Sequence, residues 1–203
     1  LASKRKFELY EKGIVNIDDL PSTMKLTDKQ QIQVNCWNEQ RKHIDKKAIK
    51  EFLQTLQSPL YFMDFETFQP AIPLYDNTRP YQQIPFQYSL YYRKNKESTL
   101  EHCEFLAETG KDPRKDFITQ LLRDTKNEGD ILVFNKPFEA TRLKELARDF
   151  PKFEKDLNER ISRVKDLMIP FEKKWYYDNA MKGSYSIMYI THYFPMVNNV
   201  MII

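Results

Sequence analysis

Asp64 and Glu66 are the residues whose types and spacing best suit chemistry. They lie in LYFMDFE (residues 60–66), a short apolar run rich in aromatic residues, typical of a buried strand. Alternation along a strand places both carboxylates on one face and Phe65 on the other. Two acids among apolar residues need a cation, and Mg²⁺ or Mn²⁺ binds one or two carboxylates together with water and phosphate oxygens. The alternative is a strand at the sheet rim whose acids are solvated or paired with Lys and Arg.

Glu139 is a third candidate acid, placed after the next apolar run, ILVFN (131–135). Asn135 ends this predicted strand, and Pro137 begins a helix that carries Glu139 in its first turn. Ligands gather at the carboxyl ends of strands in α/β sheets, which suits a third carboxylate of one site. The alternative is that Glu139 only compensates the helix dipole. Asp166, in a later short extended segment, belongs to the site or is a surface or capping acid.

The elements around these acids predict a mixed α/β domain at residues 58–203. The strands expected at 84–93 and 99–106 are joined by the polar turn KNKES, so the sheet begins as an antiparallel hairpin. Further elements are expected in the order helix (Pro113 to near Gly129), strand (131–135), helices (Pro137 to Phe150 and 152–162), short strand (164–168) and helix (184–194).

Residues 1–57 are expected to form an all-helical appendage without strands. Apolar positions there sit among Lys, Glu and Gln at helical spacing, and Thr27 or Asp28 and then Asp45 are suitable helix N-caps. The segment LYEKGIVNIDDLP (9–21) resembles a helix-hairpin-helix element, a module that grips phosphate backbones. The alternative is a plain helical adaptor.

Composition excludes several other functions. The 203 residues allow one catalytic domain and a small appendage. The four glycines are too far apart for a dinucleotide fingerprint or a phosphate loop. Cys36, Cys103 and three histidines cannot form a closed zinc site or a disulfide framework, which indicates a reducing compartment.

Hydropathy and charge give weaker indications of where the protein is located and what it binds. No apolar run approaches the ~18 residues of a membrane span, so we expect a cytoplasmic protein without a membrane partner. The net charge of +3 divides into 11 Lys/Arg against 8 Asp/Glu in residues 1–60 and 21 against 21 in the remainder. This balance permits nucleic-acid binding without arguing strongly for it. The chain begins with Leu1 and stops in an apolar stretch, so we expect a fragment of a longer protein.

The motifs taken together resemble the DEDD (DnaQ-like) superfamily of 3′–5′ exonucleases, which has a ribonuclease-H-like fold. Asp64 and Glu66 match its first motif. Asn135, Phe138 and Glu139 match its second motif, although the superfamily usually has Asp where this chain has Glu139. The third motif provides a fourth carboxylate, and the chain stops before it. Either the full protein supplies this acid or this version of the domain is degenerate.

The resemblance implies a mixed five-stranded sheet flanked by helices at residues 58–203, incomplete at its carboxyl terminus. It also implies two Mg²⁺ or Mn²⁺ ions, with Asp64 bridging both, Glu66 on one ion and Glu139 acting through water on the other. Asp166 resembles an acid that mostly supports the site. Substrate contact is expected from Thr67, Phe68, Asn135 and Phe138, because aromatic side chains stack on the bases of single strands. The alternative for the phenylalanines is core packing.

A closer resemblance is to an uncharacterised bacterial domain family placed in that superfamily, often found downstream of a RecB-type nuclease domain. It covers about residues 5–195 and rests on FMDFETFQPAIP, RPYQQIPFQYSL, NKPFEATRLKELA, KDLMIPF and GSYSI. In the most specific stretch, Gln82, Gln83 and Gln87 either satisfy backbone groups at a sheet edge or contact substrate.

Three functions follow from these observations. The first is a metal-dependent 3′–5′ exonuclease that hydrolyses single-stranded DNA or RNA from its 3′ end. The second is a non-catalytic nucleic-acid-binding or assembly module that partners another nuclease domain, such as a RecB-type domain in the same full-length chain. The third is a metal-dependent phosphotransferase or nucleotide hydrolase acting on small substrates. The presence of an acidic residue in a helix after Ile203 would discriminate the first from the second.

Overall fold

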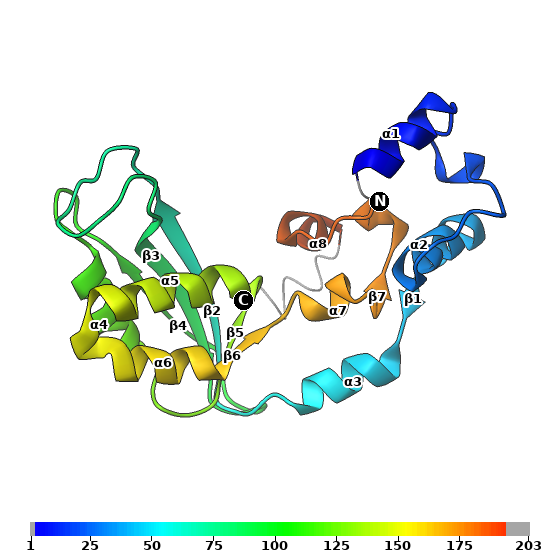
Figure 1. Cartoon of the computed structure of the whole chain (residues 1–203). Coiled ribbons are helices and arrows are strands. Elements are labelled where there is room, and N and C mark those ends of the chain that lie inside the picture. Colours follow the sequence, from blue (N-terminus) through cyan, green and yellow to red (C-terminus); the bar gives the residue numbers. More distant parts are fainter. Residues whose placement is uncertain (1–2, 194–203) are drawn as a thin grey trace. The chain divides into compact units, whose positions relative to one another are not determined.

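The computed structural model describes residues 3–193, which form two compact units (Figure 1). The sheet unit comprises residues 51–168. The helical unit comprises the described residues of 1–50 and 169–193. The sequence predicted one boundary, at residues 57 and 58. Instead, the contacts group residues 169–193 with the N-terminal residues.

The sheet unit is mixed α/β, as predicted. Its elements are β2 (Leu60–Phe68), β3 (Ile84–Arg93), β4 (Glu101–Leu106), α4 (Arg114–Asp124), β5 (Asp130–Val133), α5 (Lys136–Asp149), η2 (Pro151–Phe153), α6 (Glu154–Arg163) and β6 (Val164–Asp166). The five strands lie in the order β4-β3-β2-β5-β6. The β2-β3 and β3-β4 pairs are antiparallel, whereas β2-β5 and β5-β6 are parallel. The carboxyl ends of β2, β5 and β6 therefore meet at one edge of the sheet.

One face of this sheet carries the hydrophobic core. Tyr61, Met63 and Phe65 alternate along β2 and pack in one cluster with the apolar sides of α4, α5 and α6, which Figure 1 shows beside the sheet. Phe117 of α4 contacts the Phe65 ring edge-on, with 5.1 Å between centroids. Burial of these side chains stabilises the fold by roughly 1.5–3 kcal/mol each. The intervening residues of β2, including Asp64, project from the opposite face.

A close approach between two loops sets the parallel register of β2 and β5. Gly129 has a φ of +72°, and a Cβ atom there would lie 1.9 Å from the Pro59 carbonyl oxygen. The next residue, Asp130, donates its amide to the Gln57 carbonyl at 2.9 Å, and its carboxylate accepts the Gln57 amide at 2.8 Å. Leu60 is thereby placed opposite Asp130 in the ladder.

The helical unit contains short elements from both ends of the described chain. They are α1 (Ser3–Glu11), η1 (Ile17–Asp19), α2 (Asp28–Glu39), β1 (His43–Ile44), α7 (Ile169–Glu172), β7 (Tyr176–Tyr177), η3 (Asn179–Met181) and α8 (Ile187–Tyr193); α3 (Lys46–Gln54) leads from it into the sheet unit. Thr27 caps α2 as predicted, by accepting a hydrogen bond from the Gln30 amide. None of the helices in residues 3–193 combines the length and apolarity needed to cross a membrane.

The expectation that residues 1–57 contain no strand is wrong. His43 and Ile44 form β1, which pairs antiparallel with Tyr177 and Tyr176 of β7. Two residues are too few to produce a period-2 pattern, and the partner strand lies more than 130 positions away in sequence. This pairing is one of the contacts that join residues 169–193 to the N-terminal residues, together with the hydrogen bond from Asn179 to the Cys36 carbonyl.

Candidate active site

Asp64 and Glu66 lie on β2 as the sequence predicted. Both side chains are exposed, while Phe65 between them is buried on the core side. Ser89 and Gln87 of β3 lie opposite them in the antiparallel ladder. The register shifts at a β-bulge directly after Glu66, where β2 nears its end. The two carboxylates therefore share one face near the carboxyl end of the strand.

The surroundings of Asp64 change the pKa of its carboxylate. Burial of part of its carboxylate and the nearby Glu66 charge raise the pKa of Asp64, although its Oδ1 also accepts the Phe65 amide at 3.1 Å. A carboxylate with a raised pKa is a group whose charge lacks a compensating partner. A cation bound beside Asp64 would supply that partner.

Glu139 is the most deeply buried of the four candidate acids. Asn135 adopts a left-handed conformation (φ 85°) as the N-cap of α5, and Glu139 follows in the first turn of that helix. Only 1% of Glu139 is exposed, and its Oε2 atom is buried without a hydrogen-bond partner within the described residues. Burial and the charges of Asp64 and Asp166 raise the pKa of Glu139 to about 8. Glu139 thus lies within electrostatic reach of both other acids.

The Asp166 carboxylate accepts hydrogen bonds from three backbone amides. Its Oδ1 accepts the amides of Asn135 at 3.1 Å and Met168 at 2.9 Å, and its Oδ2 accepts the Lys136 amide at 2.9 Å. The Lys136 ammonium group in turn donates to the Val164 carbonyl at 2.7 Å. Asp166 therefore fixes the turn from β5 into α5.

The donor set can be tested against the Mg²⁺ or Mn²⁺ that the resemblance implies. Among the described residues, no group of three or more His, Cys, Asp or Glu side chains is close enough to hold an ion. Mg²⁺, however, is commonly bound by one or two carboxylates, with water and substrate phosphate oxygens as the other ligands. The unpartnered Oε2 of Glu139 and the exposed Asp64 carboxylate are the two donors that such an ion would need from this chain. A second ion needs a further donor.

The four residues predicted to contact substrate have different surroundings. Thr67 and Phe68 follow the bulge, and the Phe68 ring packs against Tyr75 and Phe86 at centroid distances of 6.3 and 5.9 Å. Asn135 shapes the start of α5 through its backbone. Phe138 packs against the core cluster, which fits its core-packing alternative. Phe68 and Phe138 are thus held by packing beside the acids, and their contact with substrate stays a prediction.

The chain can now be compared with known proteins. Residues 61–186, which include all four acids, match the model of the family described as Domain of unknown function (DUF2779). The chain belongs to this family. It is 29% identical over 130 residues to the uncharacterized protein MG366 of Mycoplasma genitalium and 28% identical over 120 residues to the MG366 homolog of Mycoplasma pneumoniae. These alignments cover 60% and 56% of this chain but only 19% and 18% of the relatives. No solved structure matches the chain significantly.

The DUF2779 domain also contains a polar clamp that the sequence analysis missed. Arg142, one turn after Glu139, donates hydrogen bonds to Gln83 and to Glu145, the latter at 2.9 Å, and its guanidinium lies 5.5 Å from the Phe138 ring centroid. Arg79 pairs with Glu145 at 2.9 Å.

A second contact extends the clamp along α5. Gln82, which is buried, donates to Asp149 at 3.0 Å and accepts the Arg79 amide at 3.2 Å. Gln82 and Gln83 of the RPYQQ stretch therefore bind side chains of α5. Gln82 also accepts a hydrogen bond from one backbone amide. The Arg142–Glu145 spacing was the only local signal of this network.

Proposed function

We propose that this DUF2779 chain forms part of the catalytic site of a metal-dependent 3′–5′ exonuclease that hydrolyses single-stranded DNA or RNA. The observation that carries the proposal is Glu139, whose buried carboxylate has an unpartnered Oε2 and lies within electrostatic reach of Asp64. Leaving one buried carboxylate oxygen without a hydrogen-bond partner costs about 1–3 kcal/mol. Such a cost at the carboxyl edge of a parallel strand pair is typical of a functional site.

The topology of the sheet unit supports the same proposal. Three antiparallel strands followed by two strands parallel to the first of them, with a helix between successive parallel strands, is the arrangement of ribonuclease-H-like domains. In this arrangement, Asp64 and Glu66 occupy the first strand and Glu139 lies in the first turn of the helix after the fourth. The topology alone does not carry function, because one fold hosts many activities. The acids at its edge carry the proposal.

The chain's own residues have distinct tasks in this proposal. Asp64 and Glu139 would hold the ion, which when bound supplies Lewis-acid stabilisation of the phosphate and a more acidic water. Glu66 lies on the same strand face and keeps negative charge beside Asp64. Asp166 and the Arg142–Gln83 clamp hold α5 so that the Glu139 carboxylate stays at the edge. Phe68 would contact the terminal base of the strand.

The test is cleavage of a single-stranded DNA and of an RNA of the same sequence, both 5′-labelled, with Mn²⁺. The comparison covers wild type, Asp64→Asn, Glu139→Gln and, as a control at an exposed site, Asp76→Asn. Each is made in this chain and in a full-length family member, because the chain spans about a fifth of the curated relatives it matches. We expect a ladder that shortens from the 3′ end, requires Mn²⁺, and is lost in both site variants but kept in the control.

A second readout does not depend on cleavage. Mn²⁺ should raise the melting temperature of the wild type and of Asp76→Asn at pH 8, because binding to the folded state stabilises it. The melting temperature of Glu139→Gln should rise much less, because this variant lacks one of the two proposed ligands. If folded full-length protein shows neither cleavage nor a Mn²⁺ shift, the exonuclease proposal is wrong. Retained strand binding would then favour the non-catalytic module.

A further inference from the structure

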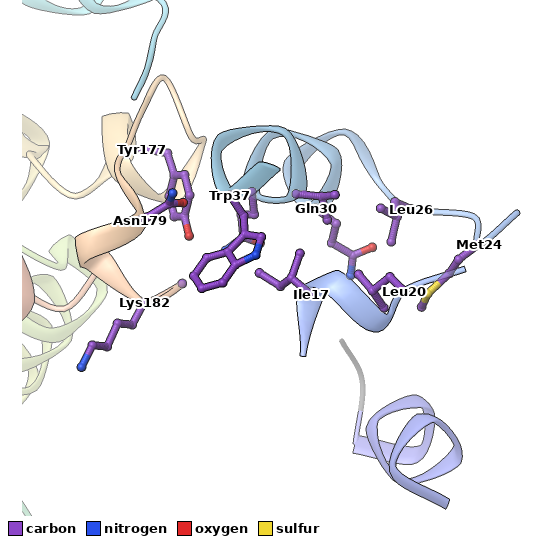
Figure 2. Close-up of a pocket in the computed structure, with 12 residues that line it drawn as sticks. Ile17, Leu20, Met24, Leu26, Gln30, Trp37, Tyr177, Asn179 and Lys182 are labelled. Atoms are coloured by element: carbon purple, nitrogen blue, oxygen red, sulfur yellow. The ribbon is translucent and has the colours of Figure 1, made fainter. Parts of the chain in front are cut away.

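The helical unit contains a cavity whose lining includes none of the four acids. It has a volume of about 370 Å³ and lies among η1, the loop after it, α2 and the segment around η3. Figure 2 shows the Trp37 ring at its centre, with Tyr177 and Asn179 on one side and Ile17 on the other. Concave, largely apolar sites of roughly 300–1,000 Å³ with a few polar groups are typical of ligand pockets.

Trp37 gives the cavity a fixed aromatic surface. Its indole Nε1 donates to the Asp18 carboxylate at 2.8 Å, which sets the orientation of the ring. The side chain nevertheless remains 38% exposed, an unusual state for a tryptophan in an apolar cavity. The ring therefore offers a face on which a planar group can stack.

Two amide side chains of the cavity are anchored at one atom and free at the other. Gln30 accepts the Thr27 amide through Oε1 at 3.0 Å, and Asn179 donates to the Cys36 carbonyl through Nδ2 at 2.8 Å. Within the described residues, neither Gln30 Nε2 nor Asn179 Oδ1 has a partner. The cavity thus presents one donor and one acceptor in fixed positions, which suits the polar edge of a heterocycle.

The rim of the cavity carries a cation. Lys182 extends outward from it in Figure 2 and has no carboxylate partner in the part of the chain that the structure describes. Neither acid of η1 pairs with Lys182 among the described residues: Asp18 accepts from Trp37, and Asp19 accepts the Asn16 amide at 3.0 Å. An anionic group outside the cavity would therefore meet an unpaired ammonium group.

Charge is divided unequally between the two units. Residues 1–50 and 169–195 hold 14 Lys/Arg against 9 Asp/Glu, whereas the other residues hold 18 against 20. The helical unit is thus positive and the sheet unit slightly negative. A net positive charge together with an exposed aromatic ring suits the binding of single-stranded nucleic acid.

We propose that this cavity binds one base of a single-stranded nucleic acid, with the base on the Trp37 ring and a neighbouring phosphate near Lys182. The proposal rests on the proposed function, since it names a second contact for the same class of substrate. A base is favoured over a peptide side chain because the free donor and acceptor of Gln30 and Asn179, and the cation at the rim, match the edge and phosphate of a nucleotide. A peptide remains an outcome of the test.

The experiment uses the two tryptophans of the chain, Trp37 and Trp175, as reporters. Protein carrying 5-fluorotryptophan gives two ¹⁹F resonances, and Trp37→Phe assigns them. The Asp64→Asn protein in EDTA is titrated with a ten-residue oligothymidylate, with an abasic oligonucleotide of the same length, and with an apolar peptide of matched length. We expect the Trp37 resonance to shift with oligothymidylate and to move far less with the other two.

Affinities then separate the base from the phosphate. Trp37→Leu should weaken oligothymidylate binding by roughly five- to 150-fold, the loss of one base–aromatic stack. Lys182→Gln should weaken binding of both oligonucleotides and reduce its salt dependence, whereas the exposed Lys173→Gln, an equal change of charge in the same unit, should have a smaller effect. Circular dichroism and melting temperature show whether each variant folds.

Three results would overturn the proposal: equal effects of abasic and ordinary oligonucleotides on Trp37, unchanged affinity in folded Trp37→Leu, or a Trp37 shift caused by the peptide and not by the oligonucleotide. The exonuclease proposal fails separately, because its evidence is cleavage and Mn²⁺ stabilisation and this titration needs neither. Base binding without any cleavage by the full-length protein would therefore leave the cavity assignment standing.

Discussion

Asp166 at the end of β6 accepts the backbone amide of Lys136, the first residue of α5, with 2.9 Å between the nitrogen and Oδ2. The two residues come from neighbouring segments at the carboxyl edge of the sheet. A carboxylate at a helix N-terminus satisfies amides that have no intrahelical partner and compensates the helix dipole. Glu139 follows Lys136 by less than one helical turn. By holding the Lys136 amide, Asp166 therefore fixes the position of the turn that carries the buried Glu139.

Replacement of Asp166 by Asn should destabilise the protein by about 1–3 kcal/mol, because one of the two acceptor oxygens becomes an amide nitrogen that cannot accept a backbone N–H. Urea denaturation would measure this change. Asp76→Asn makes the same chemical change at an exposed side chain and should be within about 0.5 kcal/mol of wild type. Equal stability of the two variants would show that the Asp166 cap contributes little.

Glu139 should make the protein less stable as pH rises. The folded state keeps the Glu139 proton up to a pKa of about 8, whereas the unfolded chain releases it near its ordinary pKa of 4.5. Between these values the unfolded state binds fewer protons, so stability falls with pH, by at most about 1.4 kcal/mol per pH unit. Below pH 4.5 this effect is absent.

Glu139→Gln removes the titration and should flatten the melting temperature between pH 5 and pH 8.5 relative to wild type. Differential scanning calorimetry without divalent ions would measure both proteins. Glu97→Gln, at an exposed turn position, serves as the control and should follow the wild-type profile. A parallel decline of wild type and Glu139→Gln would contradict the raised pKa.

The sequence could predict the placement of the acids because their signals are local. The period of two in LYFMDFE put Asp64 and Glu66 on one face, and the short segment between Asn135 and Glu139 put the third acid in a first helical turn. The β3–β4 hairpin and the succession of strands along the chain also followed from local patterns, whereas the five-stranded sheet was expected from the resemblance.

Other features depend on contacts that leave no local pattern. Asp166 binds amides 30 and 31 residues earlier, and Gln83 binds Arg142 across 59 residues. The burial of Glu139 likewise arises only when α5 packs on the sheet, so its raised pKa could not be foreseen from NKPFEATR. Sequence periodicity describes one element at a time and therefore does not predict such tertiary hydrogen bonds.

Arg142→Ala should loosen the attachment of residues 69–83 to α5, while the Arg79–Glu145 and Gln82–Asp149 contacts remain. The substitution removes the hydrogen bonds to Gln83 and Glu145 and the contact with the Phe138 ring, for a loss of about 1–3 kcal/mol. Hydrogen exchange should become faster in the β2–β3 loop. The exposed Lys144→Ala on the same helix keeps the clamp and should exchange as wild type does. Unchanged exchange in Arg142→Ala would show that other contacts hold the loop.

Gly129→Ala should be more damaging than Gly110→Ala, and the difference isolates one steric contact. Both glycines have positive φ values, +72° and +85°, so each alanine carries a conformational cost of roughly 1–2 kcal/mol. A Cβ atom at Gly110 meets open space, whereas one at Gly129 would lie 1.9 Å from the Pro59 carbonyl oxygen and must displace backbone. Urea denaturation should therefore show a loss of stability at Gly129→Ala that exceeds the loss at Gly110→Ala by about 2 kcal/mol, which places Gly129→Ala among the more damaging single substitutions. Equal losses would mean that the β2–β5 register tolerates separation of the two loops.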